Sequence, residues 1–237
     1  TIAYILTGSS PTKLGILDLI TNSLYRRECY VYEVHTFDDA DTGQFFFRME
    51  FNYRGSGEFS EDKLRTQLTD RASAFEVEWE LRNLGTLEKV VILVSKYDHC
   101  LQDLLHRYST GALNIEVPAI ISNHPDLQKQ AGWYNIPYYH LPVTPETKAE
   151  QEAKMWNIIQ HSKADLVVLA RYMQVLSEDM CKKLHGQAIN IHHSLLPGFK
   201  GAKPYHQAYD KGVKLVGATA HYVSQDLDEG PIIPQGV

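Results

Sequence analysis

Hydrophobic and polar positions in the first part of the chain follow the short periods of strands and amphipathic helices. The order of these patterns over residues 1–83 is β-α-β-β-α-β, which predicts one small α/β unit. In chain order the expected elements are a strand at 3–7, a turn at 8–12, a helix that buries Leu14, Leu17, Ile20 and Leu24, a hairpin of strands at 30–36 and 44–51, a helix capped at Ser60, and a half-exposed strand at 75–81.

The pattern changes after a short polar connector at residues 82–88. From there the expected strands are continuous apolar runs, as in sheets that helices cover on both faces. Strands that alternate with helices predict a second α/β domain over residues 88–237, with a doubly wound, mostly parallel sheet. In such sheets ligands bind beyond the carboxyl ends of the strands. The expected strands are at 89–95, 117–122, 165–170 and 188–191, with helical stretches such as 144–161 between them.

The last apolar run, at residues 230–233, is expected to be a core strand. A further helix is expected to follow it and to cover the sheet. Because the chain stops at Val237, either the C-terminal part of this domain is absent or the fold is smaller than the pattern suggests.

Composition narrows the classes of function. The 237 residues can form one or two domains, and the formal charge of −6 disfavours general nucleic-acid binding. No run of about 18 apolar residues predicts a membrane span, and no signal peptide is visible. Three widely spaced cysteines fit reduced thiols in a cytoplasmic protein. The eleven histidines lack the spacing of a metal site, so no metal is expected.

Two segments carry the residue types that are needed to move an acyl group. Asn190 and His192 lie two positions apart at a strand end, so their side chains point to the same side. Asp228 comes from a second segment, which leads into Gly230 and Pro231. Together they supply an oxyanion donor, a proton carrier and a base. Taken singly, Asn190 could be a turn residue and Asp228 an Asx-turn or cap residue.

These segments resemble the signature of the hydrolases and transferases that use formyltetrahydrofolate. The motif at 188–198 and the run at 227–233 match its two halves. The stretches at 121–127 and 140–148 are similar to the formyltetrahydrofolate deformylases in particular, and the resemblance covers essentially the whole chain.

The resemblance implies a ferredoxin-like ACT domain of βαββαβ order at 1–83, followed by a formyltransferase-like catalytic domain at 88–237. It implies hydrolysis of 10-formyltetrahydrofolate to tetrahydrofolate and formate, which supplies formate for purine synthesis and balances the one-carbon folate pools. No tightly bound cofactor is implied. Asn190 and a protonated His192 would stabilise the oxyanion, and Asp228 would orient the attacking water.

One local difference from the related glycinamide ribonucleotide transformylases favours water as the acceptor. Those relatives hold the substrate phosphate with a Gly-Ser-Asn turn, whereas residues 95–100 of this chain are Ser-Lys-Tyr-Asp-His-Cys. Larger side chains and the charge of Asp98 disfavour a phosphate. His193 also stands where the transformylases usually have proline. Two alternatives stay open, namely formyl transfer to an amine and a non-catalytic regulator that senses folate or an amino acid.

By the same resemblance, the segment after the strand at 165–170 borders the pterin, mostly through backbone groups. His193 either contacts substrate or water or packs within its loop. Arg171 is either a solvated charge or a partner of the folate glutamate tail, and His221 is expected beside the site in a neighbouring strand. The candidate substrate-binding residues are His193, Arg171, Tyr172, Met173, Val175, Leu176 and His221.

The ACT-like segment has two interpretations. It is either an amino-acid sensor with its ligand near residues 8–15 at an interface between protomers, or a dimerisation module without a ligand. The family pattern has an Asp-Arg pair before the glycine, and loss of the acidic residue in this chain removes a partner for an amino-acid ammonium. The expected assembly is a homodimer or tetramer. The candidate regulatory residues are Pro11, Thr12, Lys13 and Gly15.

Overall fold

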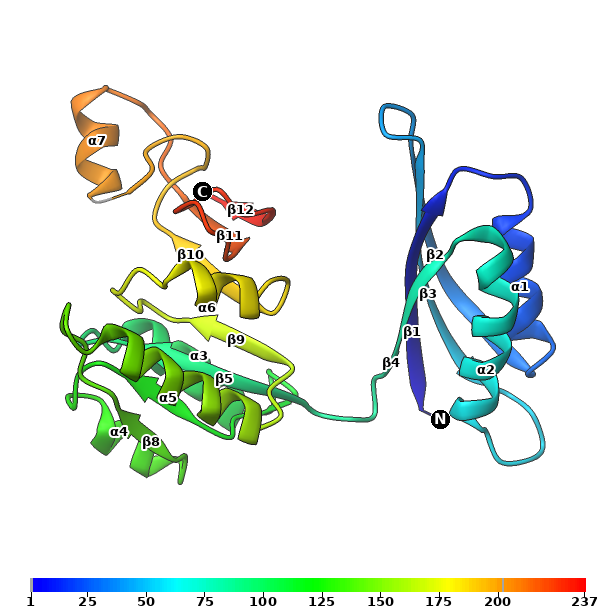
Figure 1. Cartoon of the computed structure of the whole chain (residues 1–237), viewed down its shortest axis with the longest axis horizontal. Coiled ribbons are helices and arrows are strands. Elements are labelled where there is room, and N and C mark those ends of the chain that lie inside the picture. The colour runs from blue at the N-terminus through cyan, green and yellow to red at the C-terminus, as the bar shows by residue number, and fades with distance from the viewer. Residues whose placement is uncertain (1, 202) are drawn as a thin grey trace. The chain divides into compact units, whose positions relative to one another are not determined.

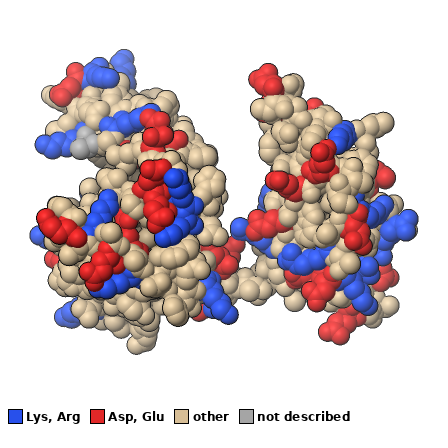
Figure 2. All heavy atoms as spheres, in the orientation of Figure 1, with Lys and Arg blue, Asp and Glu red and all other residues tan. Residues whose placement is uncertain are grey.

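The computed structural model describes residues 2–201 and 203–237, which form two compact units, one up to Thr86 and one from Leu87 onward (Figure 1). On the visible face of each unit, positive and negative side chains are interspersed (Figure 2). Among the described residues, no helix has both the length and the apolar content that a membrane crossing requires.

The N-terminal unit is an antiparallel sheet of strand order β2-β3-β1-β4 with two helices on one face (Figure 1). Its element order, β-α-β-β-α-β, is the predicted one. The elements are β1 (Ala3–Pro11), α1 (Ile16–Tyr25), β2 (Cys29–Asp39), β3 (Gln44–Tyr53), α2 (Glu61–Ala72), the 3₁₀ helix η1 (Ser73–Phe75) and β4 (Glu78–Asn83).

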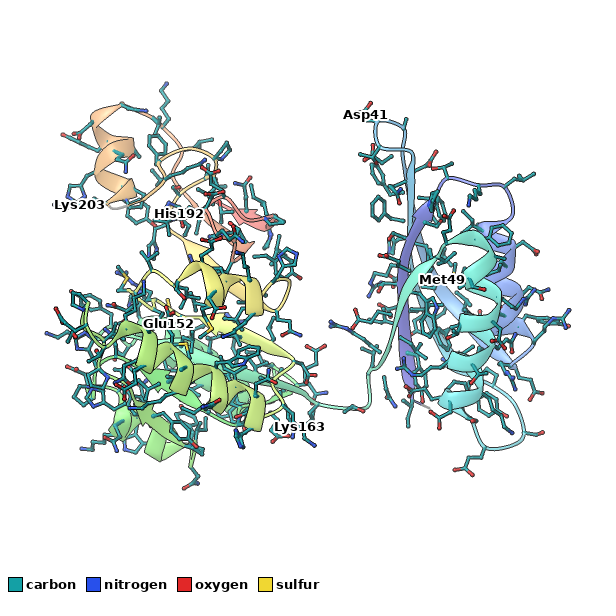
Figure 3. All side chains as sticks on the ribbon, in the orientation of Figure 1. Asp41, Met49, Glu152, Lys163, His192 and Lys203 are labelled. Carbon is teal, nitrogen blue, oxygen red and sulfur yellow. The ribbon has the colours of Figure 1, made fainter. Side chains whose placement is uncertain are left out.

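The core of this unit lies between the sheet and its two helices. Alternate residues of the strands point toward the helices because strand side chains have a period of two. Met49 of β3 is fully buried there (Figure 3), and it shares the core with Leu6 of β1 and with Leu64 of α2. Burying one such side chain contributes roughly 1.5–3 kcal/mol. The sheet and helices therefore stabilise one another.

The prediction for the first helix was right for two of its four apolar positions. Ile20 and Leu24 of α1 are fully buried, as expected. The helix begins at Ile16, after Gly15 in a left-handed conformation (φ 96°), so Leu14 precedes it and is fully exposed, and Leu17 is 43% exposed. The chain bend at Gly15 sets which side of the helix meets the sheet, and the spacing of leucines alone does not reveal it.

Two other boundaries in this unit differ from the prediction. The turn expected at 8–12 is wrong, because β1 continues to Pro11 and pairs in register with β3 as far as Gln44. The strand expected at 75–81 begins only at Glu78, after the turn of 3₁₀ helix. The hairpin of β2 and β3 and the helix cap at Ser60 are confirmed, since the Ser60 hydroxyl accepts a hydrogen bond from the Lys63 N–H.

The C-terminal unit is a single sheet of strand order β12-β11-β10-β9-β5-β7-β8, with β6 paired to β5. The strands are β5 (Glu88–Val94), β6 (Ile115–Glu116), β7 (Ile120–Ser122), β8 (Tyr138–His140), β9 (Leu166–Leu169), β10 (Ala188–His192), β11 (Ala218–Tyr222) and β12 (Ile232–Gly236). The helices are α3 (His99–Ser109), α4 (Gln128–Trp133), α5 (Lys148–His161), α6 (Glu178–Lys183) and α7 (Pro204–Asp210).

Helices cover both faces of this sheet, as the continuous apolar strands predict. One face packs Val91 and Leu93 of β5 against Met155 of α5 and Met180 of α6. The other face packs the intervening residues of β5 against α3 and α4. Because both faces are buried, the strands need apolar residues at every position.

The expectation of a mostly parallel sheet needs correction, because the sheet is mixed. The strands from β8 to β10 run parallel, but β11 is antiparallel to β10 and β12 is antiparallel to β11.

The apolar run at residues 230–233 is not the core strand that the sequence predicts. It forms β12 at the edge of the sheet, where Ile232 and Ile233 are 47% and 45% exposed. Strand pairing is a long-range property, so the local pattern does not determine it.

The Ser60 cap gives a direct test of the N-terminal unit. We expect Ser60→Ala to lower its free energy of unfolding by about 1 kcal/mol, because the Lys63 N–H loses its acceptor. Urea unfolding followed by circular dichroism measures this change. Ser56→Ala, in the same loop but exposed, is the matched control and should stay within about 0.5 kcal/mol of the wild type. Equal losses in the two variants would contradict the role of the cap.

Candidate active site

The candidate site lies at the carboxyl end of β10, where the sheet changes from parallel to antiparallel pairing. Asn190 and His192 alternate with Ile191, so both project from the same face of the strand. His221 of β11 is the direct cross-strand partner of Asn190. The strand pairing therefore brings a third polar side chain to the two that the sequence predicts.

The loop between β11 and β12 brings Asp228 to these residues. Asp228 has a left-handed backbone (φ 59°), which is uncommon for a residue other than glycine. Gly230 then lets the chain pass close to β11, because a Cβ atom there would lie 1.7 Å from the Tyr222 carbonyl oxygen. The Tyr222 N–H donates to the Pro231 carbonyl at 2.9 Å. The Gly-Pro sequence thus folds the loop back over the site.

Asp228 is the centre of the polar cluster, with only 7% of its surface exposed. Its Oδ2 atom accepts a hydrogen bond from the Gly201 N–H at 3.0 Å and lies 3.3 Å from Nδ1 of His192. Its Oδ1 atom lies 3.7 Å from Nε2 of His221. The two carboxylate oxygens therefore differ, since Oδ2 is held by its neighbours and Oδ1 faces His221 at a longer distance.

His192 is 7% exposed and both of its ring nitrogens face acceptors. Nε2 lies 2.9 Å from the Phe199 carbonyl oxygen, which can only accept, so Nε2 carries a proton. Nδ1 faces the Asp228 carboxylate. Two acceptors fit an imidazolium ring best, because that form donates from both nitrogens.

His221 has the opposite arrangement. Its Nδ1 lies 2.9 Å from the Tyr222 carbonyl oxygen and therefore donates to it. Its Nε2 lies 3.3 Å from Nδ2 of Asn190, which is an amide donor, so Nε2 accepts. These partners define a neutral imidazole. His221 consequently fixes the orientation of the Asn190 amide and leaves its second N–H for another acceptor.

A cavity of about 630 Å³ opens over this cluster, and we call it the β10 cavity. This volume is within the range of pockets that hold small ligands. All the predicted catalytic and substrate-binding residues lie in its wall, namely Asn190, His192, Asp228, His193, Arg171, Tyr172, Met173, Val175, Leu176 and His221.

The segment after β9 forms one side of the β10 cavity. The Met173 N–H donates to the Ser95 hydroxyl at 2.9 Å, which ties this segment to the end of β5. Met173 and Val175 are exposed, at 61% and 60%, whereas Tyr172 is buried. Burial raises the pKa of Tyr172 to about 12, and Glu152 adds to the rise, so Tyr172 stays a neutral phenol. This wall offers apolar surface and backbone groups to a ligand.

Two parts of the wall were not anticipated from the sequence. One is the start of α7, where Lys203 lies (Figure 3), and the other is the loop segment that precedes Asp228. Pro204 at the first turn of α7 is a helix-start signal, but nothing local connects that helix to Asn190. The added wall residues in these parts are Lys203, Pro204, Tyr205, His206, Ser224, Gln225, Asp226 and Leu227.

His193 follows β10 and lies with its ring centroid 6.1 Å from that of Tyr205. Burial lowers its pKa below the ordinary value of 6.5, and the positive charges of Arg171, His192 and His99 lower it further. His193 is therefore mainly neutral near pH 7, in a region where other groups are positive.

The candidate regulatory residues of the N-terminal unit are bonded within that unit. The Thr12 hydroxyl donates to Asp38 at 2.6 Å, and Lys13 pairs with Glu76. Pro11 ends β1, and Gly15 precedes α1. A hollow of about 430 Å³ in this unit has a wall that includes none of the four candidates, being formed by Arg27, Asp62, Lys63, Thr66, Gln67, Asp70 and Arg71.

Within residues 2–201 and 203–237, no group of three or more His, Cys, Asp or Glu side chains has a geometry that could hold a metal ion. The polar cluster at the end of β10 presents the Asn190 amide, the imidazoles of His192 and His221 and the Asp228 carboxylate to this cavity. This set can stabilise an oxyanion and transfer protons.

Comparison with known proteins first shows the fold class of the C-terminal unit. The model of the formyl transferase family matches residues 88–237, which contain the whole β10 cavity. Phosphoribosylglycinamide formyltransferase from Coxiella burnetii is 33% identical with a TM-score of 0.59, over 63% of this chain and 72% of that chain. The C-terminal unit thus has a formyl transferase fold.

Longer matches define the particular family. Formyltetrahydrofolate deformylase from Corynebacterium sp. (strain P-1) is 47% identical over 100% of this chain and 82% of its own length. The crystal structure of a formyltetrahydrofolate deformylase from Pseudomonas putida KT2440 is 55% identical with a TM-score of 0.91, over 99% of this chain and 83% of that chain. The chain belongs to the formyltetrahydrofolate deformylase family.

The environment of His193 can be tested by titration. We expect its ring to titrate below pH 6.5, and Arg171→Gln to raise its pKa because one neighbouring positive charge is lost. NMR of the histidine ring resonances against pH measures both. Between the folded-state pKa and 6.5 the unfolded chain binds more protons, so stability from this residue is lost as the pH falls.

Lys163→Gln is the control for this titration, because Lys163 follows α5 and does not line the β10 cavity. It removes one positive charge, as Arg171→Gln does, and should leave the His193 pKa unchanged. An unaltered His193 pKa in Arg171→Gln would show that the guanidinium has no influence on the ring.

Proposed function

We propose that the protein hydrolyses 10-formyltetrahydrofolate to tetrahydrofolate and formate, with Asn190, His192 and Asp228 as the catalytic residues. The observation that carries this proposal is the convergence of those side chains on one cavity, in a chain of the deformylase family. By the resemblance, the reaction supplies formate for purine synthesis and balances the one-carbon folate pools.

The attacking water is placed by Asp228. Oδ2 of this residue is held by Gly201 and His192, which leaves Oδ1 to accept a hydrogen bond from water. The water oxygen forms a bond to the formyl carbon, and the formyl oxygen becomes an oxyanion. The second N–H of the Asn190 amide donates to this oxyanion, because the first is directed to His221.

His192 also stabilises the negative charge of the oxyanion. Its Nδ1 lies 3.3 Å from Asp228, which is longer than a strong charge-assisted hydrogen bond. The proton on Nδ1 is therefore available to an oxyanion beside it. When the bond between the formyl carbon and N10 breaks, the proton that Asp228 received from the water passes to N10. The formic acid that forms loses its acidic proton to solvent and leaves as formate.

Water fits this site better than a phosphorylated amine. At the end of β5, where the sequence differs from the transformylases, the Tyr97 ring lies 5.3 Å from the Arg171 guanidinium. The Ser95 hydroxyl is already used by Asn123 and Met173. The Ser95 hydroxyl thus has both partners within the protein, and the negative charge of Asp98 in the same turn disfavours a phosphate.

The substrate is held by the remaining predicted residues. The segment from Arg171 to Leu176 offers backbone groups and apolar side chains to the pterin. His221 acts on the substrate indirectly, because it orients Asn190. His193 lies in the same wall and is neutral near pH 7.

The N-terminal unit is inferred to be an ACT-like domain that joins copies of the chain into a homo-oligomer. Its sheet exposes aromatic side chains, and the rings of Phe37 and Phe46 lie 6.3 Å apart, at 64% and 42% exposure. Thr12 and Lys13 are engaged by their own unit, which favours association over amino-acid sensing.

The catalytic proposal is tested by formate release from 10-formyltetrahydrofolate without an added amine. We expect Asn190→Ala to lower kcat by about 100- to 1,000-fold through loss of one oxyanion donor. Asp228→Asn should lower kcat by at least about 100-fold through loss of the base. Asp210→Asn, an exposed change in α7 outside the cavity wall, is the control and should leave kcat unchanged.

Other outcomes of this assay favour the other functions. Product formation that requires an added amine favours formyl transfer. Tight binding of folate without turnover favours a non-catalytic regulator. Equal formate release by Asp228→Asn and the wild type would show that the carboxylate is not the base.

The mass of the assembly in solution tests the proposed homo-oligomer. We expect Phe37→Asp to shift the oligomer toward monomers, because a carboxylate replaces an apolar contact at the interface. Light scattering over a range of protein concentrations measures the shift. Tyr25→Asp is the control, since Tyr25 is also an exposed aromatic but lies at the end of α1, on the helical side. An unchanged mass in Phe37→Asp would contradict an interface on this sheet.

A further inference from the structure

Arg171 is a cation without a carboxylate partner in the wall of the β10 cavity. Its Nε atom is buried and donates no hydrogen bond to the described residues. It forms no ion pair with any carboxylate in the described part of the chain. A buried donor without a partner is costly. The residue also has a left-handed backbone (φ 60°), which is uncommon outside glycine.

The guanidinium is held by Tyr97, whose ring lies 5.3 Å from its central carbon. A cation–π contact gives the guanidinium no oxygen acceptor, so its N–H groups still lack one among the described residues. Those donors match the two oxygens of a carboxylate in a planar, bidentate arrangement. Arg171 thus offers donors to a carboxylate that the described protein residues do not supply.

Arg171 has an electrostatic neighbour in His193. His193 is close enough for the guanidinium to lower its pKa, and His192 and His99 act on it in the same direction. The carboxylates in the cavity wall come from Asp226 and Asp228, which both lie in the loop before β12. The positive charge of Arg171 therefore attracts an anion to its side of the cavity, where His193 is a neutral neighbour, and the loop side repels one.

We propose that Arg171 and His193 form a carboxylate subsite that receives formate after it is released beside Asp228. The inference rests on the proposed function, because hydrolysis is the step that produces this anion in the cavity. Formate is planar and its two oxygens match the guanidinium edge. Its transfer away from the Asp228 carboxylate would free the position of the attacking water for the next turnover.

The glutamate tail of folate also carries carboxylates, so it is a second ligand that fits Arg171. The two ligands predict different kinetic effects of Arg171. A site for the tail would lower KM for the full substrate but not for a formylated pteroate that lacks glutamate. A site for formate would act equally in reactions with either substrate, through inhibition by the product.

The first experiment measures inhibition by formate with both substrates. We expect Arg171→Gln to raise the inhibition constant of formate at least about tenfold with either substrate, and Arg171→Lys to raise it less because the charge remains. Lys203→Gln is the matched control, since it removes a cation from another part of the same wall. It should change the inhibition constant by less than about twofold.

Two results of this experiment would overturn the inference. One is an inhibition constant that is the same in Arg171→Gln and in the wild type. The other is a rise in KM for the full substrate alone, with inhibition by formate unchanged, which would assign Arg171 to the glutamate tail.

The second experiment needs neither turnover nor a variant. Formate bound beside His193 should raise the pH at which its ring resonances titrate, because an anion offsets the neighbouring positive charges. Acetate at equal ionic strength is the comparison for size. An unchanged titration in the presence of formate overturns the subsite.

The two proposals fail in different ways. Release of formate from substrate, with no effect of added formate on inhibition or on His193, overturns the subsite and leaves the hydrolase. Binding of formate at His193 without any release from substrate supports the subsite and overturns the hydrolase.

Discussion

The buried carboxylate of Asp228 is the constraint on which the rest of the site depends. A charge removed from water is stable only when it is paired and hydrogen-bonded. The partners of this carboxylate come from two separate segments, with His192 at the end of β10 and Gly201 in the following loop. The neutral ring of His221 in β11 lies 3.7 Å from Oδ1 and fixes the orientation of the Asn190 amide. Loss of one partner therefore disturbs the whole cluster.

The sequence patterns predicted the features that depend on neighbouring residues alone. The period of two at β10 placed Asn190 and His192 on one face, and the motif around Asp228 marked a second segment for the same cavity. The patterns failed where the answer depends on distant parts of the chain. The direction of β11, the exposure of β12 and the extension of β1 to Pro11 follow from strand pairing. The contribution of α7 to the cavity wall is another long-range property.

Three of the eight described non-glycine residues with positive φ line the β10 cavity. They are Arg171, Lys203 and Asp228. A left-handed residue other than glycine typically costs of order 1–3 kcal/mol, so such residues persist where the surrounding structure holds them in place. At Asp228 the holding contacts are visible, and at Arg171 the Tyr97 ring contributes one. At these two positions the left-handed backbone is thus accompanied by contacts of the side chain.

The cross-strand register of Asn190 and His221 has a consequence for how such a protein can diversify. Both residues are carried by paired strands, so the part of the β10–β11 connection that follows α7 can gain or lose residues without moving them. The earlier part is constrained, because Phe199 and Gly201 hold His192 and Asp228. A single deletion inside β11 would instead turn His221 to the opposite face and present Ala220 or Tyr222 in its place. Insertions or deletions after α7 can therefore change the rim of the β10 cavity, while the paired strands keep Asn190 and His221 in register.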